Sequence, residues 1–128
     1  MTQDDKEAIK FGLEMACILS HQAAVDGGWW HDLETGEELE RNDAELICLM
    51  HSELSEAMEG VRKNLMDDKL PHRPAVEVEL ADALHRIFDY AGARNLDVAG
   101  AYIEKAAFNA ERADHKPENR RKDGGKAF

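Results

Sequence analysis

The sequence has few of the residues that interrupt helices or cross-link chains. Among its 128 residues only three are proline, Pro71, Pro74 and Pro117, so long stretches have nothing to break a helix. The two cysteines, Cys17 and Cys48, have a spacing that matches no zinc motif. We therefore expect reduced thiols, as is usual in cytoplasmic proteins.

Positive charge and long apolar runs are also scarce. The chain has 16 Lys and Arg against 27 Asp and Glu, a formal net charge of −11, which argues against non-specific binding of nucleic acid or of anionic lipid. No apolar run approaches the roughly 20 residues of a membrane span, and the polar start MTQDDKEAIK is unlike a signal peptide. We expect a cytoplasmic protein with no nucleic-acid or membrane partner. A small polyanion such as a nucleotide could still bind through metal ions.

The residues that are abundant favour helices. Apolar residues make up 43% of the chain, and the stretches between the prolines are rich in Ala, Leu, Glu and Met. A chain of this length can form one domain with one core. We predict a single all-α domain over residues 1–128, with its core at about 5–114 and a flexible, charged tail over 115–128.

Several residues mark where the helices begin and end. Asn42 can cap a helix with Glu45 as the third helical residue, and Asp97 is a second candidate cap. Gly27, followed by a second glycine, is expected to end the first helix. The four expected helices cover about 4–25, 42–63, 75–94 and 97–114.

Two consecutive helices carry carboxylates in matching pairs. The stretch HSELSEAMEG places Glu53 and Glu56 one turn apart, and VEVELADALHR places Glu79 and Asp82 at the same spacing. On each helix the first carboxylate borders the side that is expected to be buried, and the second lies about 60° further out. The four can therefore converge if the helices pack antiparallel. The stripes expected to be buried contain Leu46, Met50, Leu54, Ala57, Met58 and Val61 on one helix, and Val76, Leu80, Ala83, Leu84, Ile87, Phe88 and Ala91 on the other.

The carboxylate pairs have two interpretations. Unpaired carboxylates at the edge of a core repel one another and are costly to desolvate, and hard cations such as Mg²⁺ and Mn²⁺ reverse that cost. Alternatively, the pairs are solvated helix flanks, with Asp82 and Arg86 as an i, i+4 ion pair. Both interpretations remain open at this point.

A cationic strip is predicted on the fourth helix. Lys105, Asn109, Arg112 and Lys116 fall within about 60° of one another on a helical wheel. Phosphate oxygens are natural partners for such side chains, although the strip could instead pair with the protein's own surplus acids. Together with the carboxylates, the strip describes a site for metal plus polyphosphate.

These motifs resemble those of a known family. ELSE at 53–56 followed by ELAD at 79–82 resembles the ExxE…ExxD signature of the MazG-like all-α nucleoside triphosphate pyrophosphohydrolases, and KAAFNAER at 105–112 resembles their KxxxNxxR element. The resemblance covers about residues 42–120. Many members have a further acid directly before the first motif glutamate, where this chain has Ser52.

The resemblance implies a fold, a reaction and a set of residues. It implies an antiparallel four-helix-bundle-like structure in which helices of two protomers build each site, as a homodimer or a dimer of dimers. It implies cleavage of (d)NTPs between the α and β phosphates, giving a nucleoside monophosphate and pyrophosphate, with Mg²⁺ as cofactor and Mn²⁺ as a substitute. The implied metal ligands are Glu53, Glu56, Glu79 and Asp82, with Glu53 or Glu56 orienting or deprotonating the attacking water, and Lys105, Asn109 and Arg112 contacting phosphate or sugar.

Three further residues are candidates for substrate contact. Trp29 and Trp30 could stack on a base, or could anchor their loop to the core or to a subunit interface. Asn64 could reach a base edge, or could simply end its helix. The paired tryptophans favour a purine deoxynucleotide such as dGTP. Two other classes of function remain: a di-iron or di-manganese carboxylate bundle, and a non-catalytic helical interaction protein.

Overall fold

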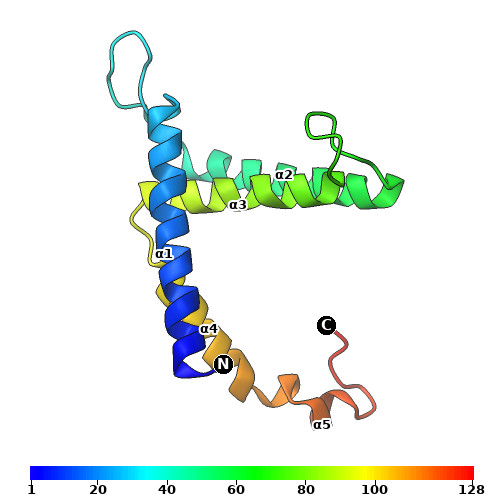
Figure 1. The fold of residues 1–128 in the computed structure, drawn as a ribbon. Helices are drawn as coiled ribbons and strands as arrows, with labels where there is room; N and C mark the ends of the chain where they lie inside the picture. The colour runs from blue at the N-terminus through cyan, green and yellow to red at the C-terminus, as the bar shows by residue number, and fades with distance from the viewer. The chain divides into compact units, whose positions relative to one another are not determined.

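The computed structural model describes residues 1–128, and all of its named elements are helices, which confirms the predicted all-α class (Figure 1). The chain forms two compact units, residues 15–96 and residues 1–14 with 97–128. No helix combines the length and the apolar character that crossing a membrane requires. The elements are α1 (Gln3–Asp26), α2 (Asp43–Lys63), α3 (Ala75–Ala93), α4 (Val98–Glu111), the 3₁₀ helix η1 (Ala113–His115) and α5 (Pro117–Arg120).

The capping residues act as the sequence predicts. The side chain of Asn42 accepts a hydrogen bond from the backbone N–H of Glu45 at 3.0 Å, and that of Asp97 accepts one from Gly100 at 2.8 Å. At the other end of α2, Asn64 adopts a left-handed conformation with φ of 51° and closes the helix. The boundaries of α2 and the start of α4 are thereby confirmed.

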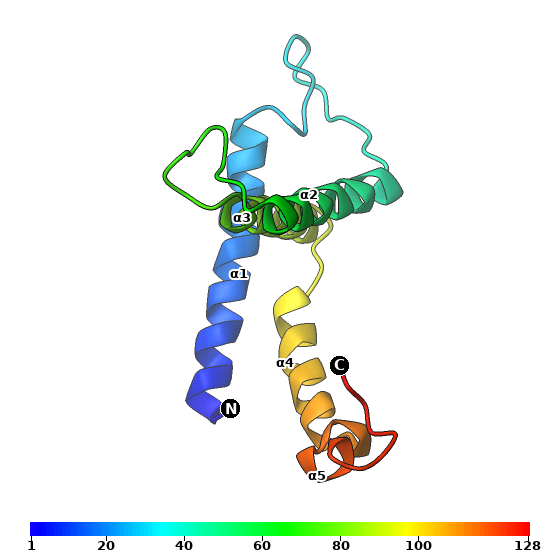
Figure 2. The same ribbon diagram turned by 90° about the vertical axis from the view of Figure 1, so that its right-hand side faces the viewer.

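In the unit formed by residues 15–96, α2 and α3 make an antiparallel hairpin. Three contacts fix the direction: Arg94 bonds Asp43, Arg86 bonds Glu53, and Gly60 lies against Ala75, so contacts that advance along α2 retreat along α3. The two helices lie side by side in both views (Figure 1, Figure 2). The predicted antiparallel packing of the two acidic helices is therefore confirmed.

Small residues make the contact between these helices. A Cβ added to Gly60 would lie 3.1 Å from the Cβ of Ala75, which shows how closely the backbones approach. The buried residues of α2 and α3 are otherwise mostly alanine. They are Leu46, Glu53, Ala57 and Gly60 on α2 and Ala75, Ala83 and Ala91 on α3.

Much of the apolar surface that was expected to be buried is exposed. Met58 and Val61 are 65% and 64% exposed. Leu54, Leu80 and Leu84 are 48%, 45% and 49% exposed. The predicted stripes are thus wrong for these five residues within one chain. The reason is that Ala and Gly fill the interhelical contact, so the larger side chains on the same flank project outward. We call these outward-facing residues the apolar stripe; it contains Ile47, Leu54, Met58 and Val61 of α2 and Leu80 and Leu84 of α3.

The C-terminal part of α1 packs on α3 through a second close approach. A Cβ at Gly92 would lie 2.6 Å from the Cβ of His21 and 2.7 Å from the carbonyl oxygen of Cys17. His21 Nδ1 also lies 2.8 Å from Asp89 Oδ1, one turn earlier on α3. A glycine at position 92 is therefore needed for α1 to reach α3.

Replacing Gly92 by alanine is expected to destabilise the protein by about 1–3 kcal/mol, because the backbone of α1 must move away to admit the methyl group. Gly12, also in α1, is the matched control. A Cβ there meets nothing within 4 Å, so Gly12→Ala should raise stability by about 0.5–1 kcal/mol through helix propensity alone. Urea unfolding of both variants measures the difference, and equal effects at the two positions would contradict the packing described.

In the other unit, α4 ends earlier than predicted. Its last residue is Glu111, and Arg112 is extended with ψ of 129°. Arg112 donates to both carboxylate oxygens of Asp114 at 3.0 and 2.7 Å, a pairing that the helical conformation would not provide. Arg112 and Lys116 therefore lie beyond α4, and the predicted strip along one helical face is wrong at its C-terminal half.

The segment predicted as a flexible tail contains local structure. Asn119 donates from its side chain to the carbonyl of Ala113 at 2.6 Å. The guanidinium of Arg120 donates to the carbonyls of Lys126 and Ala127 at 3.1 and 2.8 Å, which folds the C-terminus back onto α5. The mobility of this segment remains a prediction.

Candidate metal centre and adjoining cavity

Three of the four predicted metal ligands meet between α2 and α3. One carboxylate oxygen each from Glu53, Glu56 and Glu79 lies within 4.8 Å of the others, and we call these residues the acidic cluster. Glu53 is buried, Glu79 is half-buried and Glu56 is exposed, so the cluster runs from the helix interface to the surface. Asp82 lies outside this group, yet close enough for its charge to raise the pKa of Glu56.

The helical spacing explains why these carboxylates converge. Glu53 and Glu56 are one turn apart on α2, and Glu79 projects toward them from α3 because the helices are antiparallel. Oxygen ligands from several carboxylates form the donor set that Mg²⁺ and Mn²⁺ prefer. The cluster could therefore hold a hard divalent cation, and it contains no histidine or cysteine.

Arg86 neutralises the buried member of the cluster. Its Nε donates to Oε1 of Glu53 at 2.6 Å, across the α2–α3 interface. The alternative considered for the sequence paired Arg86 with Asp82 on the same helix, and the structure gives Glu53 as its partner instead. The reason is that Glu53 is buried and faces α3, whereas Asp82 is exposed to water.

The cluster shifts the pKa values of its members in opposite directions. Burial would raise the pKa of Glu53, but the hydrogen bond and charge of Arg86, with hydrogen bonding to Glu56 and Glu79, hold it below the ordinary 4.5. The pKa of Glu56 is raised, first by its hydrogen bond to Glu53. The pKa of Glu79 is raised, first by burial and then by the charge of Glu56. Without a cation, the cluster thus retains protons at a pH where isolated glutamates have lost them.

These shifts predict how divalent metal stabilises the protein as pH changes. Because the folded-state pKa values of Glu56 and Glu79 are raised, the metal-free protein loses stability as pH rises from 4.5 through those values. A bound cation favours the charged carboxylates and offsets that loss. We expect the increase in Tm on adding Mn²⁺ to be small below pH 4.5 and to grow as pH rises through this window. Differential scanning fluorimetry over pH measures this, and a pH-independent increase would contradict it.

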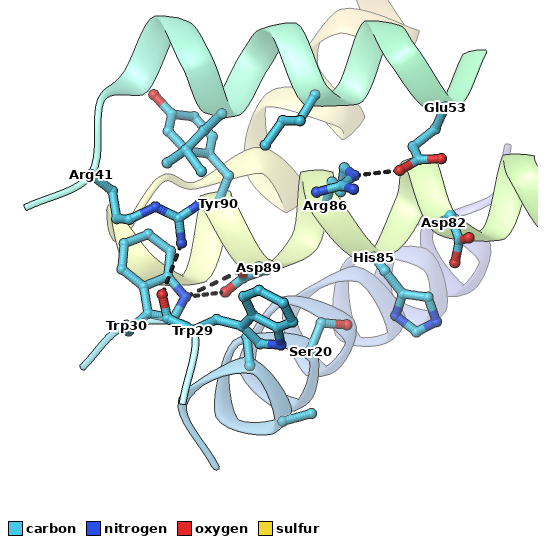
Figure 3. A pocket seen from close by; sticks show the side chains of 14 residues that line it. Ser20, Trp29, Trp30, Arg41, Glu53, Asp82, His85, Arg86, Asp89 and Tyr90 are labelled. Atoms are coloured by element: carbon cyan, nitrogen blue, oxygen red, sulfur yellow. Dashed lines mark hydrogen bonds and ion pairs between the residues drawn. The ribbon is translucent and has the colours of Figure 1, made fainter. Parts of the chain in front are cut away.

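A cavity of about 610 Å³ adjoins the cluster. This volume lies within the range of small-molecule sites. Glu53 and Asp82 line one part of it, whereas Trp29, Trp30 and Tyr90 line another (Figure 3). The cavity therefore joins a carboxylate end to an aromatic end within one unit of the protein.

The two tryptophans differ in their surroundings. Trp30 is only 5% exposed, and its Nε1–H donates to both oxygens of Asp89 at 2.9 and 3.2 Å. The guanidinium groups of Arg41 and Arg94 lie 5.3 and 5.6 Å from the centre of its ring, in cation–π geometry. Trp30 therefore anchors its loop to α3, as one of the two interpretations of the sequence proposed.

Trp29 is presented to solvent by that anchored loop. Its side chain is 68% exposed, and its backbone carbonyl accepts a hydrogen bond from Arg41 at 2.8 Å. Trp29 can therefore offer a ring face at the cavity without breaking an existing side-chain hydrogen bond.

A smaller cavity of about 230 Å³ also borders the cluster. Glu56 and Glu79 line it, together with residues of the 64–74 loop. Within that loop the buried side chain of Asp67 accepts hydrogen bonds from the backbone N–H groups of Lys69 and Leu70, which shapes the turn. Asn64, a candidate for substrate contact, is the residue that ends α2.

The residues of the predicted cationic strip belong to the unit of residues 1–14 and 97–128. Lys105 Nζ lies 4.8 Å from the ring centre of Phe108, and Lys116 is half-buried in the extended segment before α5. The charge of Arg112 is paired with Asp114, as the alternative interpretation of the strip proposed. Asn109 differs from these, because its Oδ1 is buried and accepts no hydrogen bond from the protein.

Sequence reasoning missed the arginines of this region. Arg86 was considered only as a partner of Asp82, and Arg41 was not singled out. The sequence signal for Arg86 was its position one turn after Asp82, but its partner lies 33 residues away, on the other helix. Only the packing of the two helices reveals such a pairing.

Comparison of the chain with protein-family models, curated proteins and solved structures finds no match. The function is therefore inferred from the acidic cluster, the cavity beside it and the spacing of the motifs.

Proposed function

We propose that the protein hydrolyses (d)NTPs between the α and β phosphates in a divalent-metal-dependent reaction, giving a (d)NMP and pyrophosphate. The observation that carries this proposal is the meeting of Glu53, Glu56 and Glu79 at the edge of a cavity large enough for a nucleotide. The resemblance of the motifs to the MazG-like pyrophosphohydrolases supports the same reaction. Asp82 is the proposed fourth metal ligand, since it borders the cavity beside Glu53.

Mg²⁺ or Mn²⁺ fits the donor set, which consists only of carboxylate oxygens. When bound, such a cation would neutralise phosphate charge and lower the pKa of a coordinated water. A water oxygen forms a bond to the α phosphorus while the bond from that phosphorus to the bridging oxygen breaks, and pyrophosphate leaves. Glu56 is the proposed acceptor of the water proton, because it is the exposed member of the cluster and its pKa is raised.

The aromatic end of the cavity is the proposed site for the base. Trp29 can stack on it, whereas Trp30 holds the loop that presents Trp29. A wide indole face favours a purine, so a deoxynucleotide such as dGTP is the proposed preferred substrate.

Phosphate or sugar contact is proposed for residues of the 105–116 region, carried over from the KxxxNxxR resemblance. Asn109 supports the sugar contact, because its buried Oδ1 accepts no hydrogen bond from the protein and a sugar hydroxyl can donate to it, whereas phosphate oxygens cannot. Lys105 remains a proposed phosphate contact. Arg112 would first have to release Asp114, and Lys116 lies beyond the helix that carries the motif.

A second copy of the chain is the proposed cover for the apolar stripe. Met58, Val61 and Leu84 would be costly to leave in water, and a homodimer or dimer of dimers built on this face would complete a bundle of α2–α3 hairpins. The resemblance to the family implies the same assembly. The apolar stripe and the acidic cluster lie on the same two helices, so dimerisation and activity should depend on each other.

The test is product analysis with a panel of eight dNTPs and NTPs in the presence of Mg²⁺ or Mn²⁺. Anion-exchange chromatography distinguishes (d)NMP with pyrophosphate from (d)NDP with phosphate. We expect the first pair of products, only with metal, and a ranking that identifies the substrate. Absence of turnover with every nucleotide and both metals would refute the proposal for the common nucleotides and favour a non-catalytic helical protein. Oxygen-dependent colour on adding Fe²⁺ would favour a di-iron bundle instead.

A further inference from the structure

The contact between Arg86 and Glu53 places a cation at the buried end of the acidic cluster. The Nε–Oε1 distance is 2.6 Å, and the two side chains come from facing helices. Their exposures differ, since the Glu53 side chain is 8% exposed and that of Arg86 is 41% exposed. The carboxylate is thus held in the interface, while much of the guanidinium remains accessible.

Most of the hydrogen-bonding capacity of Arg86 is unused. Arginine has five N–H donors, and the bond of Arg86 to Glu53 uses only Nε. Arg94, the residue that ends the same helix, provides a comparison: its Nε binds Asp43 and its Nη2 binds the carbonyl of Arg41. Arg94 is therefore built into the fold, whereas the terminal nitrogens of Arg86 are available to a ligand.

Arg86 lies between the two ends of the large cavity. Along α3 it follows Asp82 by four residues and precedes Asp89 and Tyr90 by three and four, which is about one turn, or roughly 5–6 Å, in each direction. All four line the cavity (Figure 3). A nucleotide with its phosphates at the carboxylate end and its base at the aromatic end would place its α-phosphate near Arg86.

We propose that Arg86 is an anion-binding residue that exchanges partners, holding Glu53 in the metal-free protein and the α-phosphate of the substrate when metal is bound. This inference rests on the proposed function. A divalent cation in the cluster supplies Glu53 with the positive charge that Arg86 supplies without it. The planar guanidinium, whose terminal N–H groups are free, can then bind two phosphate oxygens at once.

The exchange gives Arg86 a role that a purely structural ion pair would not have. A structural arginine would support Glu53 in every state, so its loss would weaken metal binding and lower Tm. If Arg86 instead competes with metal for Glu53, its loss strengthens metal binding. Metal affinity therefore distinguishes the two roles without any measurement of activity.

The test uses Arg86→Gln and Arg86→Lys in the full-length protein, with Arg73→Gln as the matched control. Arg73 lies just before α3, and its pair with Glu77 is exposed on the surface. Two affinities are measured: that for Mn²⁺ alone, by electron paramagnetic resonance, and that for an α,β-methylene analogue of dGTP with Mg²⁺, by calorimetry. Circular dichroism establishes that each variant is helical.

For Arg86→Gln we expect analogue affinity to fall roughly 10- to 100-fold, while Mn²⁺ affinity increases. Arg86→Lys keeps the charge but loses the planar fork, so its affinity for the analogue should lie between those of wild type and Arg86→Gln. If the glutamine variant does not fold, the two affinities of Arg86→Lys provide the test. The Arg73→Gln control should match wild type in both affinities.

Two results would overturn the inference: unchanged analogue affinity, or Mn²⁺ affinity that fails to increase when Arg86 is replaced by glutamine. Failure of the proposed function would be recognised separately, since the wild-type protein itself would then bind no triphosphate analogue. That result would also remove the basis for the exchange.

Discussion

Glu53→Gln is expected to remove most divalent-metal binding and to reduce pyrophosphate release roughly 100- to 1000-fold, which corresponds to about 3–4 kcal/mol of lost charge stabilisation. The reason is that Glu53 is the buried carboxylate of the acidic cluster, with oxygens of Glu56 and Glu79 within 4.8 Å of its own. Glutamine has nearly the same shape but a neutral side chain, which makes it a poor replacement for a carboxylate ligand. Mn²⁺ titration and the pyrophosphate assay measure the two effects.

The control for this substitution is Glu77→Gln. Glu77 is an exposed glutamate on α3, two residues from Glu79, and pairs with Arg73. We expect it to leave metal affinity and turnover unchanged. Without metal, Glu53→Gln should change Tm little, because it leaves Arg86 unpaired but also relieves repulsion within the acidic cluster. Wild-type metal binding and turnover in Glu53→Gln would exclude the cluster as the site.

Met58→Lys is expected to convert the protein to a monomer and to abolish most of its activity. Met58 is 65% exposed in a single chain and lies in the apolar stripe that a second copy is proposed to cover. An unpaired ammonium group buried in such an interface should cost about 3 kcal/mol or more, raising the dissociation constant by roughly 100-fold or more. Analytical ultracentrifugation and the pyrophosphate assay, made on the same samples, test both parts.

Leu33→Lys provides the matched control for the change at Met58. Leu33 is 85% exposed in the loop after α1, away from the apolar stripe, so the same kind of substitution should leave the assembly intact. A monomeric wild-type protein that retains full turnover would show that the apolar stripe has another function.

The ends of the helices could be predicted because they depend on local interactions. Asn42 and Asp97 cap helices through side-chain bonds to backbone groups three residues away, so the sequence alone contains the whole interaction. Predicting that Glu53 and Glu56 lie one turn apart on α2 also required only the helical repeat. Their convergence with Glu79 follows from the antiparallel packing of the two helices.

Other features could not be predicted because they depend on which residues fill the interhelical contact. The periodicity marks Met58 as apolar and on the inner flank, but it cannot show that alanines bring the backbones so close that Met58 projects outward. The partner of Arg86 lies on another helix, 33 residues away, whereas the sequence offered Asp82 on the same helix. Similarly, α4 ends at Glu111, where Arg112 forms a bidentate ion pair with Asp114 in place of another helical turn.

The most direct test of the central claim is anomalous diffraction from crystals grown with Mn²⁺ and the α,β-methylene dGTP analogue. We expect a manganese peak bound by oxygens of Glu53, Glu56 and Glu79, with the α-phosphate beside it. The same map would also show whether Asp82 is a ligand. Manganese bound only elsewhere, with these three carboxylates carrying no metal while the analogue is present, would contradict the account.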